Sequence, residues 1–230
     1  LLQFIHRNIA YFVFCYVIFL FFKTKNVSAQ FQFHRTRWLL LGMIMLLICA
    51  MMTSISIVRE KETGTMEVLL VSPMKPIYII LAKAVPYFVL SFVNLATILL
   101  LSVFVLHVPI AGNFFVLILV SLLFIFVSLS LGLLISTVTQ NQIAAMLVSG
   151  LVLLMPTTLM SGMIYPIDAM SAPLQVISSI LPARWYIEIV RKVMIQGVSV
   201  FFVLKEIAIL VLMAFVLIMI SLKKFKIRLE

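Results

Sequence analysis

Residues 84–120 read AVPYFVLSFVNLATILLLSVFVLHVPIAGNFFVLILV, and the apolar character continues to Ile167 without one Asp, Glu, Lys or Arg. The whole chain is 65% hydrophobic and 10% charged, with a mean hydropathy of +1.29. Soluble domains carry about a quarter charged residues, so this composition indicates a lipid bilayer as the solvent. We therefore predict an all-α fold, that of a polytopic α-helical membrane protein.

The apolar sequence divides into runs of roughly 20 residues, the length that a helix needs to cross a bilayer. Five runs have that length: about 38–58, 78–106, 114–136, 143–162 and 206–222. A weaker sixth run, 9–22, precedes them. The chain thus divides into residues 1–37, an N-terminal span and linker, and residues 38–230, the main transmembrane domain. Residues 1–37 are open to three interpretations: a true span, a signal peptide, or the remnant of a truncated N-terminus.

Positive charges gather at the ends of the spans, which orients them because cytoplasmic loops collect Lys and Arg. The last of these groups consists of Lys223, Lys224, Lys226 and Arg228. The rule places the C-terminus, the loop 57–77 and the turn 137–142 in the cytoplasm, and the turn 107–113 outside. The basic linker 23–37 conflicts with the external side that a first span would give it. The net charge of +10 is explained by the span ends, so we do not expect nucleic acid as a partner.

The loop between the first two of the five spans contains a charged segment, IVREKETGTMEVLLVSPM at residues 57–74. Gly64 can end the incoming helix, because glycine tolerates the left-handed conformation that follows a helix C-terminus. A new short helix can follow, with Met66, Leu69 and Leu70 forming an apolar stripe. Such an elbow is either a docking site for a soluble partner or a solvated connector, and the physical argument leaves both open.

The segment before the last span, residues 163–197, is too apolar for a loop and too interrupted by proline for a span. It predicts short helices at 172–181 and 183–196, which would form an external re-entrant or interfacial hairpin. An ordinary interfacial loop anchored by Trp185 and Tyr186 is the alternative.

Charged residues cluster on one side of the second of these helices. Glu188 can pair with Arg184 or with Lys192 inside that helix. The residues that define the external hairpin are Pro166, Pro182, Arg184, Trp185 and Glu188.

The order of residues in the elbow resembles the signature of ABC-2-type permeases, the membrane subunits of bacterial ATP-driven exporters. LMSGMIYP (159–166) and LPARWY (181–186) also look like that family's external region. The resemblance covers Leu39 to Leu222. It implies that the segment 59–76 couples the permease to an ATP-binding subunit. The implied coupling residues are Arg59, Glu60, Glu62, Gly64, Thr65, Glu67, Leu69 and Leu70. Many members carry a large external domain after the first span, and residues 1–37 do not match it.

The chain contains no GxxxxGK[ST] sequence with which to bind ATP. The resemblance therefore implies no cofactor and no enzymatic activity in this chain, with ATP bound by a partner. The implied partners are an ABC ATP-binding subunit, a second permease subunit (in a homo- or heterodimer) and the bilayer. The implied function is export of a drug, lipid-like or polysaccharide substrate across the cell (inner) membrane.

Two alternatives stay open. One is an ATP-independent secondary transporter or channel. Such proteins usually place ionisable groups at mid-membrane, and the five spans contain essentially none; Asn94, and His107 at a span end, are the nearest polar candidates. The other is a non-functional fragment of a permease. Neither Cys15 nor Cys49, each in an apolar run, has the spacing of a metal or disulfide site.

Overall fold

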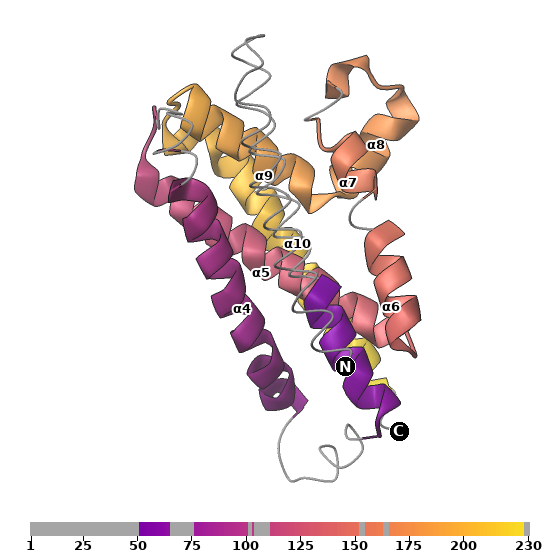
Figure 1. Cartoon of the computed structure of the whole chain (residues 1–230). Helices are drawn as coiled ribbons and strands as arrows, with labels where there is room; N and C mark the ends of the chain where they lie inside the picture. Colours follow the sequence, from indigo (N-terminus) through magenta and orange to yellow (C-terminus); the bar gives the residue numbers. More distant parts are fainter. Residues whose placement is uncertain are drawn as a thin grey trace, which may run out of the picture. The chain divides into compact units, whose positions relative to one another are not determined.

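The computed structural model describes residues 51–64, 76–100, 103, 111–151, 155–162 and 166–227, all within one compact unit, Thr36–Glu230. These residues form helices and loops and contain no strand, which confirms the all-α prediction (Figure 1). The α-helices are α4 (Pro76–Leu100), α5 (Phe114–Val138), α6 (Gln142–Ser149), α7 (Met155–Met160), α8 (Ala172–Ile180), α9 (Pro182–Val190) and α10 (Leu204–Ile227). The shorter elements are the 3-10 turns η3 (Ile167–Ala169) and η5 (Val200–Val203) and the π turn η4 (Arg191–Ile195). Residues 51–62 form a further helix.

Two described helices are long and apolar enough to cross a membrane, Phe114–Val138 and Val200–Ser221. They correspond to the predicted spans 114–136 and 206–222. α4 is also a long helix and contains Pro86, but its strongly apolar part is the shorter stretch Ala84–Thr97.

The other predicted spans are described only in part. The run 143–162 forms α6 and α7, with residues 152–154 between them outside the described chain. The run 38–58 is helical from residue 51 onward. The run 9–22, like the rest of residues 1–37, lies outside the described residues.

Local sequence explains where the helices begin. Asn113 caps α5 by accepting a hydrogen bond from the Phe115 N–H at 2.9 Å, and Asn141 caps α6 by accepting from the Ala144 N–H at 2.7 Å. Asparagine is among the best N-cap residues because its side-chain oxygen satisfies an otherwise unpaired N–H. α9 starts at Pro182, whose missing N–H costs nothing in the first turn.

α5 is the helix around which the core forms, since it packs against α4, α9 and α10. The buried core includes Leu117, Val120, Phe124 and Ile125 of α5, Ile189 and Val190 of α9, and Leu210 of α10. Ser121 and Ser128 lie among these side chains and are also buried. Small residues of this kind let helices approach closely in membrane proteins.

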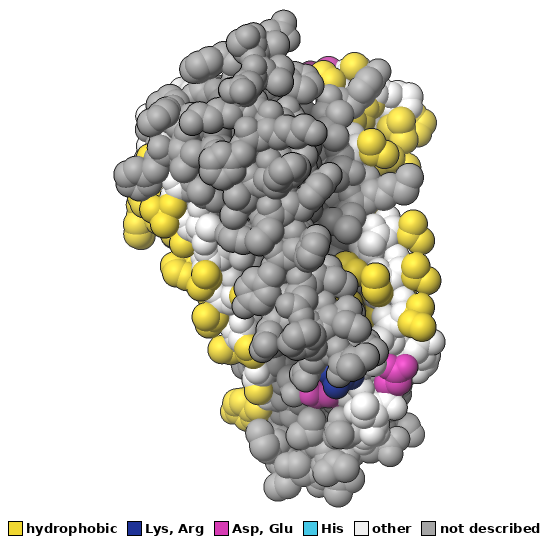
Figure 2. Space-filling model, in the orientation of Figure 1, with side chains coloured by type: hydrophobic (Ala, Val, Ile, Leu, Met, Phe, Trp, Pro, Cys, Tyr) yellow, Lys and Arg dark blue, Asp and Glu magenta, His cyan; other side chains and the backbone are white. Residues whose placement is uncertain are grey.

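Large apolar side chains also cover much of the outer surface. Val89 and Phe92 of α4, and Leu212 and Phe215 of α10, are exposed. Figure 2 shows such side chains along α4 and along α6. Exposed apolar surface on this scale is expected where lipid or another membrane chain replaces water.

Candidate functional site

The charged end of the helix over residues 51–62 is the first part of the site. The helix stops in a turn where the Thr63 N–H donates to the Arg59 carbonyl at 3.0 Å and the Gly64 N–H donates to the Lys61 carbonyl at 3.3 Å. Gly64 has φ +74°, in the left-handed region. This confirms the prediction that Gly64 ends the incoming helix. Of the predicted coupling residues, Thr65, Glu67, Leu69 and Leu70 lie outside the described residues.

The turn between α5 and α6 lies against this helix end. The Gln142 side chain donates to the Glu62 carboxylate at 2.6 Å, and the Lys61 ammonium donates to the Ser136 carbonyl. Arg59 and Glu62 are exposed, whereas Glu60 is half-buried. Figure 2 shows acidic and basic side chains gathered together at one end of the face that it draws. The sequence predicts the two loops separately but gives no sign that they touch.

The predicted external hairpin, made of α8 and α9, is held together by its basic and aromatic residues. Arg184 donates to the Gln175 carbonyl at 2.9 Å, and the Trp185 indole N–H donates to the Ser179 carbonyl at 2.9 Å. The Arg184 guanidinium also lies 5.1 Å from the centre of the Trp185 ring. The guanidinium of Arg184 therefore contacts α8 and the adjacent Trp185 ring, and Arg184 is not the partner of Glu188.

Among the prolines of the predicted hairpin, Pro166 and Pro182 have different surroundings. Pro182, at the start of α9, is buried, and Pro166, which precedes η3, is exposed. Ser178 of α8 donates to the Met160 carbonyl at 2.6 Å, which joins the hairpin to α7.

Tyr186 fixes the hairpin to the core. Its ring stacks on Phe124 of α5, with centroids 4.2 Å apart and planes within 5° of parallel. Its hydroxyl lies 3.0 Å from the Ser121 hydroxyl. Because Ser121 donates to the Leu117 carbonyl, Tyr186 is the donor in this pair. Tyr186 is only 8% exposed, so the alternative in which it anchors a loop at the lipid surface is wrong.

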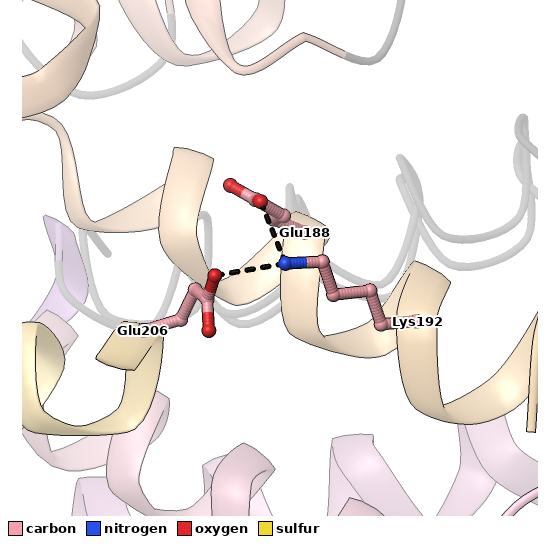
Figure 3. Close-up of polar contacts among 3 residues, drawn as sticks. All are labelled: Glu188, Lys192 and Glu206. Atoms are coloured by element: carbon pink, nitrogen blue, oxygen red, sulfur yellow. Dashed lines mark hydrogen bonds and ion pairs between the residues drawn. The ribbon is translucent and has the colours of Figure 1, made fainter. Parts of the chain in front are cut away.

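A three-residue charge cluster joins the hairpin to the last long helix (Figure 3). The Lys192 ammonium lies 3.0 Å from Glu188 and 2.8 Å from Glu206 of α10. The hydrogen bond to Glu206 outweighs the partial burial of Lys192 and raises the pKa of this lysine above its ordinary value. Of the two partners that the sequence predicts for Glu188, the structure shows Lys192.

Glu206 is the residue that the sequence interpretation missed. It is the one acidic residue between Glu188 and Glu230, and it stands at the start of an apolar run. An acid in that position needs a cation to stabilise it. This need for a cation could have identified Glu206 from the sequence, with Lys192 as the candidate partner.

The end of the hairpin approaches the turn before α5 closely. The Ala111 N–H donates to the Met194 carbonyl at 3.1 Å, and a Cβ on Gly112 would lie 2.3 Å from the Val193 carbonyl oxygen. Gly197, with φ +65°, lies against Ala111 in the same contact, where an added Cβ would be 3.1 Å from the Ala111 carbonyl oxygen. The hairpin is therefore attached to α5, to α10 and to the turn that leads into α5.

This close approach predicts that Gly112→Ala destabilises the protein by about 1–3 kcal/mol, because the new methyl group must push backbone away from backbone. Gly150→Ala is the matched control, since nothing lies within 4 Å of its added Cβ. Thermal unfolding of both variants in detergent measures the difference. Equal midpoints for the two variants would contradict the close contact.

Comparison with known proteins identifies the class of this chain. It matches the ABC-2 type transporter family over residues 2–195 and belongs to that family. Membership confirms the family that the elbow signature indicates, a family of multi-pass membrane proteins. The sequence matches no solved structure.

Named relatives are found in bacteria and in a eukaryote. The chain is 37% identical to "Probable multidrug ABC transporter permease YbhS" of Escherichia coli (strain K12) over 154 residues, covering 67% of this chain and 41% of the relative. It is 29% identical to "Probable multidrug ABC transporter permease YbhR" of the same organism over 160 residues, with 70% and 43% covered. It is 29% identical to "ABC transporter G family member 20" of Dictyostelium discoideum over 168 residues, with 73% and 23% covered. The chain spans less than half the length of these relatives.

Proposed function

We propose that this chain is the permease component of an ATP-driven exporter and that its elbow docks on a separate ATP-binding subunit. The observation that carries the proposal is the end of the helix over residues 51–62. It presents the exposed charge of Arg59 and stops at Gly64 in a left-handed turn. The chain thus leaves the helix abruptly at the segment that resembles the family's coupling segment.

The proposed complex contains two permease subunits and two ATP-binding subunits, with ATP bound by the latter. The complex lies in the inner membrane of the cell. The elbow and the C-terminus face the cytoplasm, and α8 and α9 lie on the external side. Closure of the ATP-binding subunits pushes the elbow and re-packs the helices, a rigid-body form of switching.

The proposed substrate is a drug or another apolar or amphipathic molecule. The names of the two E. coli relatives, both described as probable multidrug permeases, support this class. So does α5, which contains no charged residue along Phe114–Val138. A helix of that kind offers no site for an ion and gives the ATP-independent carrier little support.

The proposal predicts that Arg59→Glu strongly reduces co-purification of the ATP-binding subunit from native membranes. A reversed charge at an exposed interface position opposes the partner's complementary charges. Arg191→Glu is the matched control, because Arg191 is also an exposed arginine but lies in η4. We expect at least a tenfold loss of captured subunit for Arg59→Glu and none for the control. Capture of no ATP-binding subunit by the unaltered full-length protein would contradict the proposed function.

A further inference from the structure

Two consecutive residues of the helix over residues 51–62, called the elbow helix from here on, contact the ends of α5 and α6. Lys61 contacts the Ser136 carbonyl in the last turn of α5, and Glu62 accepts from the side chain of Gln142, the first residue of α6. In Figure 1 the helix over residues 51–62, drawn in indigo and violet, lies beside α6. The contacts join segments about 75–80 positions apart in the chain.

The charges match the electrostatics of the two helix ends. The last carbonyls of a helix lack intrahelical partners and form its negative end. Thr139 satisfies the Ile135 carbonyl, at 3.1 Å through its N–H and 2.9 Å through its hydroxyl, and Lys61 satisfies Ser136. The N-terminus of α6 is a positive end, and the carboxylate of Glu62 lies there. The order Lys-Glu therefore matches the order in which the chain leaves α5 and enters α6.

An apolar contact also joins the elbow helix to α6, beside the polar contact of Glu62 with Gln142. Ile55 and Val58 of the elbow helix are buried against Ala145 of α6. The elbow helix thus meets α6 through both apolar and polar side chains. A displacement of the elbow would act directly on the α5–α6 turn.

α5 connects that turn to the hairpin. Ser136 lies near its C-terminal end, whereas Phe124 and Ser121, which hold Tyr186, lie three to four turns earlier along the same helix. α9 is also attached to α10 through Lys192 and Glu206. A continuous series of described contacts therefore runs from Lys61, through Ser136 and α5, to Tyr186 of the hairpin.

We propose that Lys61 and Glu62 form a polar joint that transmits movement of the elbow through α5 to the hairpin of α8 and α9. Both are positioning residues that face this chain, and the docking of the ATP-binding subunit belongs to other elbow residues. This inference rests on the proposed function, because the movement is driven by that subunit.

The test exchanges donor and acceptor across the joint. Gln142→Glu places a second carboxylate opposite Glu62 and disrupts the joint, and adding Glu62→Gln restores one donor and one acceptor. Gln140→Glu is the matched control, because Gln140 is exposed in the same turn and gains the same charge. Each variant is made in the full-length protein without other cysteines, purified with its ATP-binding subunit and placed in lipid nanodiscs.

The readout is the labelling rate of a cysteine in the hairpin, which requires no knowledge of the substrate. Ile180→Cys in α8 is suitable because Ile180 is 68% exposed. We expect ATP to change the maleimide labelling rate at least threefold in the parent and in Gln140→Glu. The change should disappear in Gln142→Glu and return in the double variant. Capture of the ATP-binding subunit should be equal in all four.

The outcomes separate the joint from the proposed function. Failure of the parent to capture an ATP-binding subunit would overturn the function itself. Three results, each with normal capture, would overturn the joint alone. The first is a labelling rate in the parent that ATP does not change. The others are an equal response to ATP in Gln142→Glu and Gln140→Glu, and no recovery of the response in the double variant. A loss of capture confined to the double variant would place Glu62 at the subunit interface and would also overturn the joint.

Discussion

Replacement of Tyr186 by alanine should lower the free energy of unfolding by about 3–5 kcal/mol, the range for removal of a large buried aromatic side chain. The ring lies against Phe124 and its hydroxyl donates to Ser121, both on α5. The substitution removes the stacked pair and leaves a cavity between α9 and α5. SDS titration in mixed micelles, extrapolated to zero SDS, measures the loss.

Two further variants separate the ring from the hydroxyl and from general effects of losing an aromatic residue. Tyr186→Phe keeps the stack and loses one neutral hydrogen bond, so we expect a loss of about 1 kcal/mol. Tyr78→Ala removes the same side chain from a position that is 55% exposed, and its effect should stay within about 0.5 kcal/mol. If Tyr186→Ala were no worse than Tyr78→Ala, the hairpin would not depend on this contact.

The sequence predicts best those features that depend on local chemistry. A long run that is almost wholly apolar forms a helix wherever it lies in a bilayer, so α5 and α10 are found where they are expected. Gly64 ends its helix because few other residues adopt a positive φ without strain. The short helices α8 and α9 follow from prolines that separate two periodic segments.

The contacts between distant segments could not be predicted in the same way. Hydropathy treats Tyr186 as an interfacial aromatic residue, whereas packing on Phe124 buries it. Spacing within one helix gave Glu188 two equal partners. Arg184 was removed from that choice by the Gln175 carbonyl of the neighbouring helix. Pairings of this kind depend on how helices pack, which a single sequence does not specify.

Replacement of Lys192 by methionine should destabilise the protein because it leaves Glu206 without its cation. The Glu206 side chain is 6% exposed and that of Lys192 is 29% exposed. Loss of one partner from a buried pair costs about 3–5 kcal/mol. We expect about 2–3 kcal/mol here, since solvent reaches Lys192 and screens the pair. Chemical unfolding in mixed micelles gives the value.

The pH dependence of this loss follows from the raised pKa of Lys192. A lysine whose pKa is higher in the folded state stabilises the fold fully below its unfolded pKa, about 10.4, and loses this effect as pH rises through the folded value. The difference between Lys192→Met and the parent should therefore stay constant from about pH 7 to 9 and shrink only above about pH 10.4. A difference that disappeared between pH 7 and 9 would contradict a charged Lys192 as its source.

A second substitution shows whether the unpaired acid causes the loss. Lys192→Met with Glu206→Gln removes the uncompensated charge, so the double variant should recover most of the stability that the single variant lost. Lys205→Met is the matched control, because Lys205 is an exposed lysine next to Glu206 in α10. Its loss should have little effect. If the double variant were as unstable as Lys192→Met, the role of Lys192 would be the packing of its aliphatic chain. The attachment of the hairpin to α10 would then be apolar and not ionic.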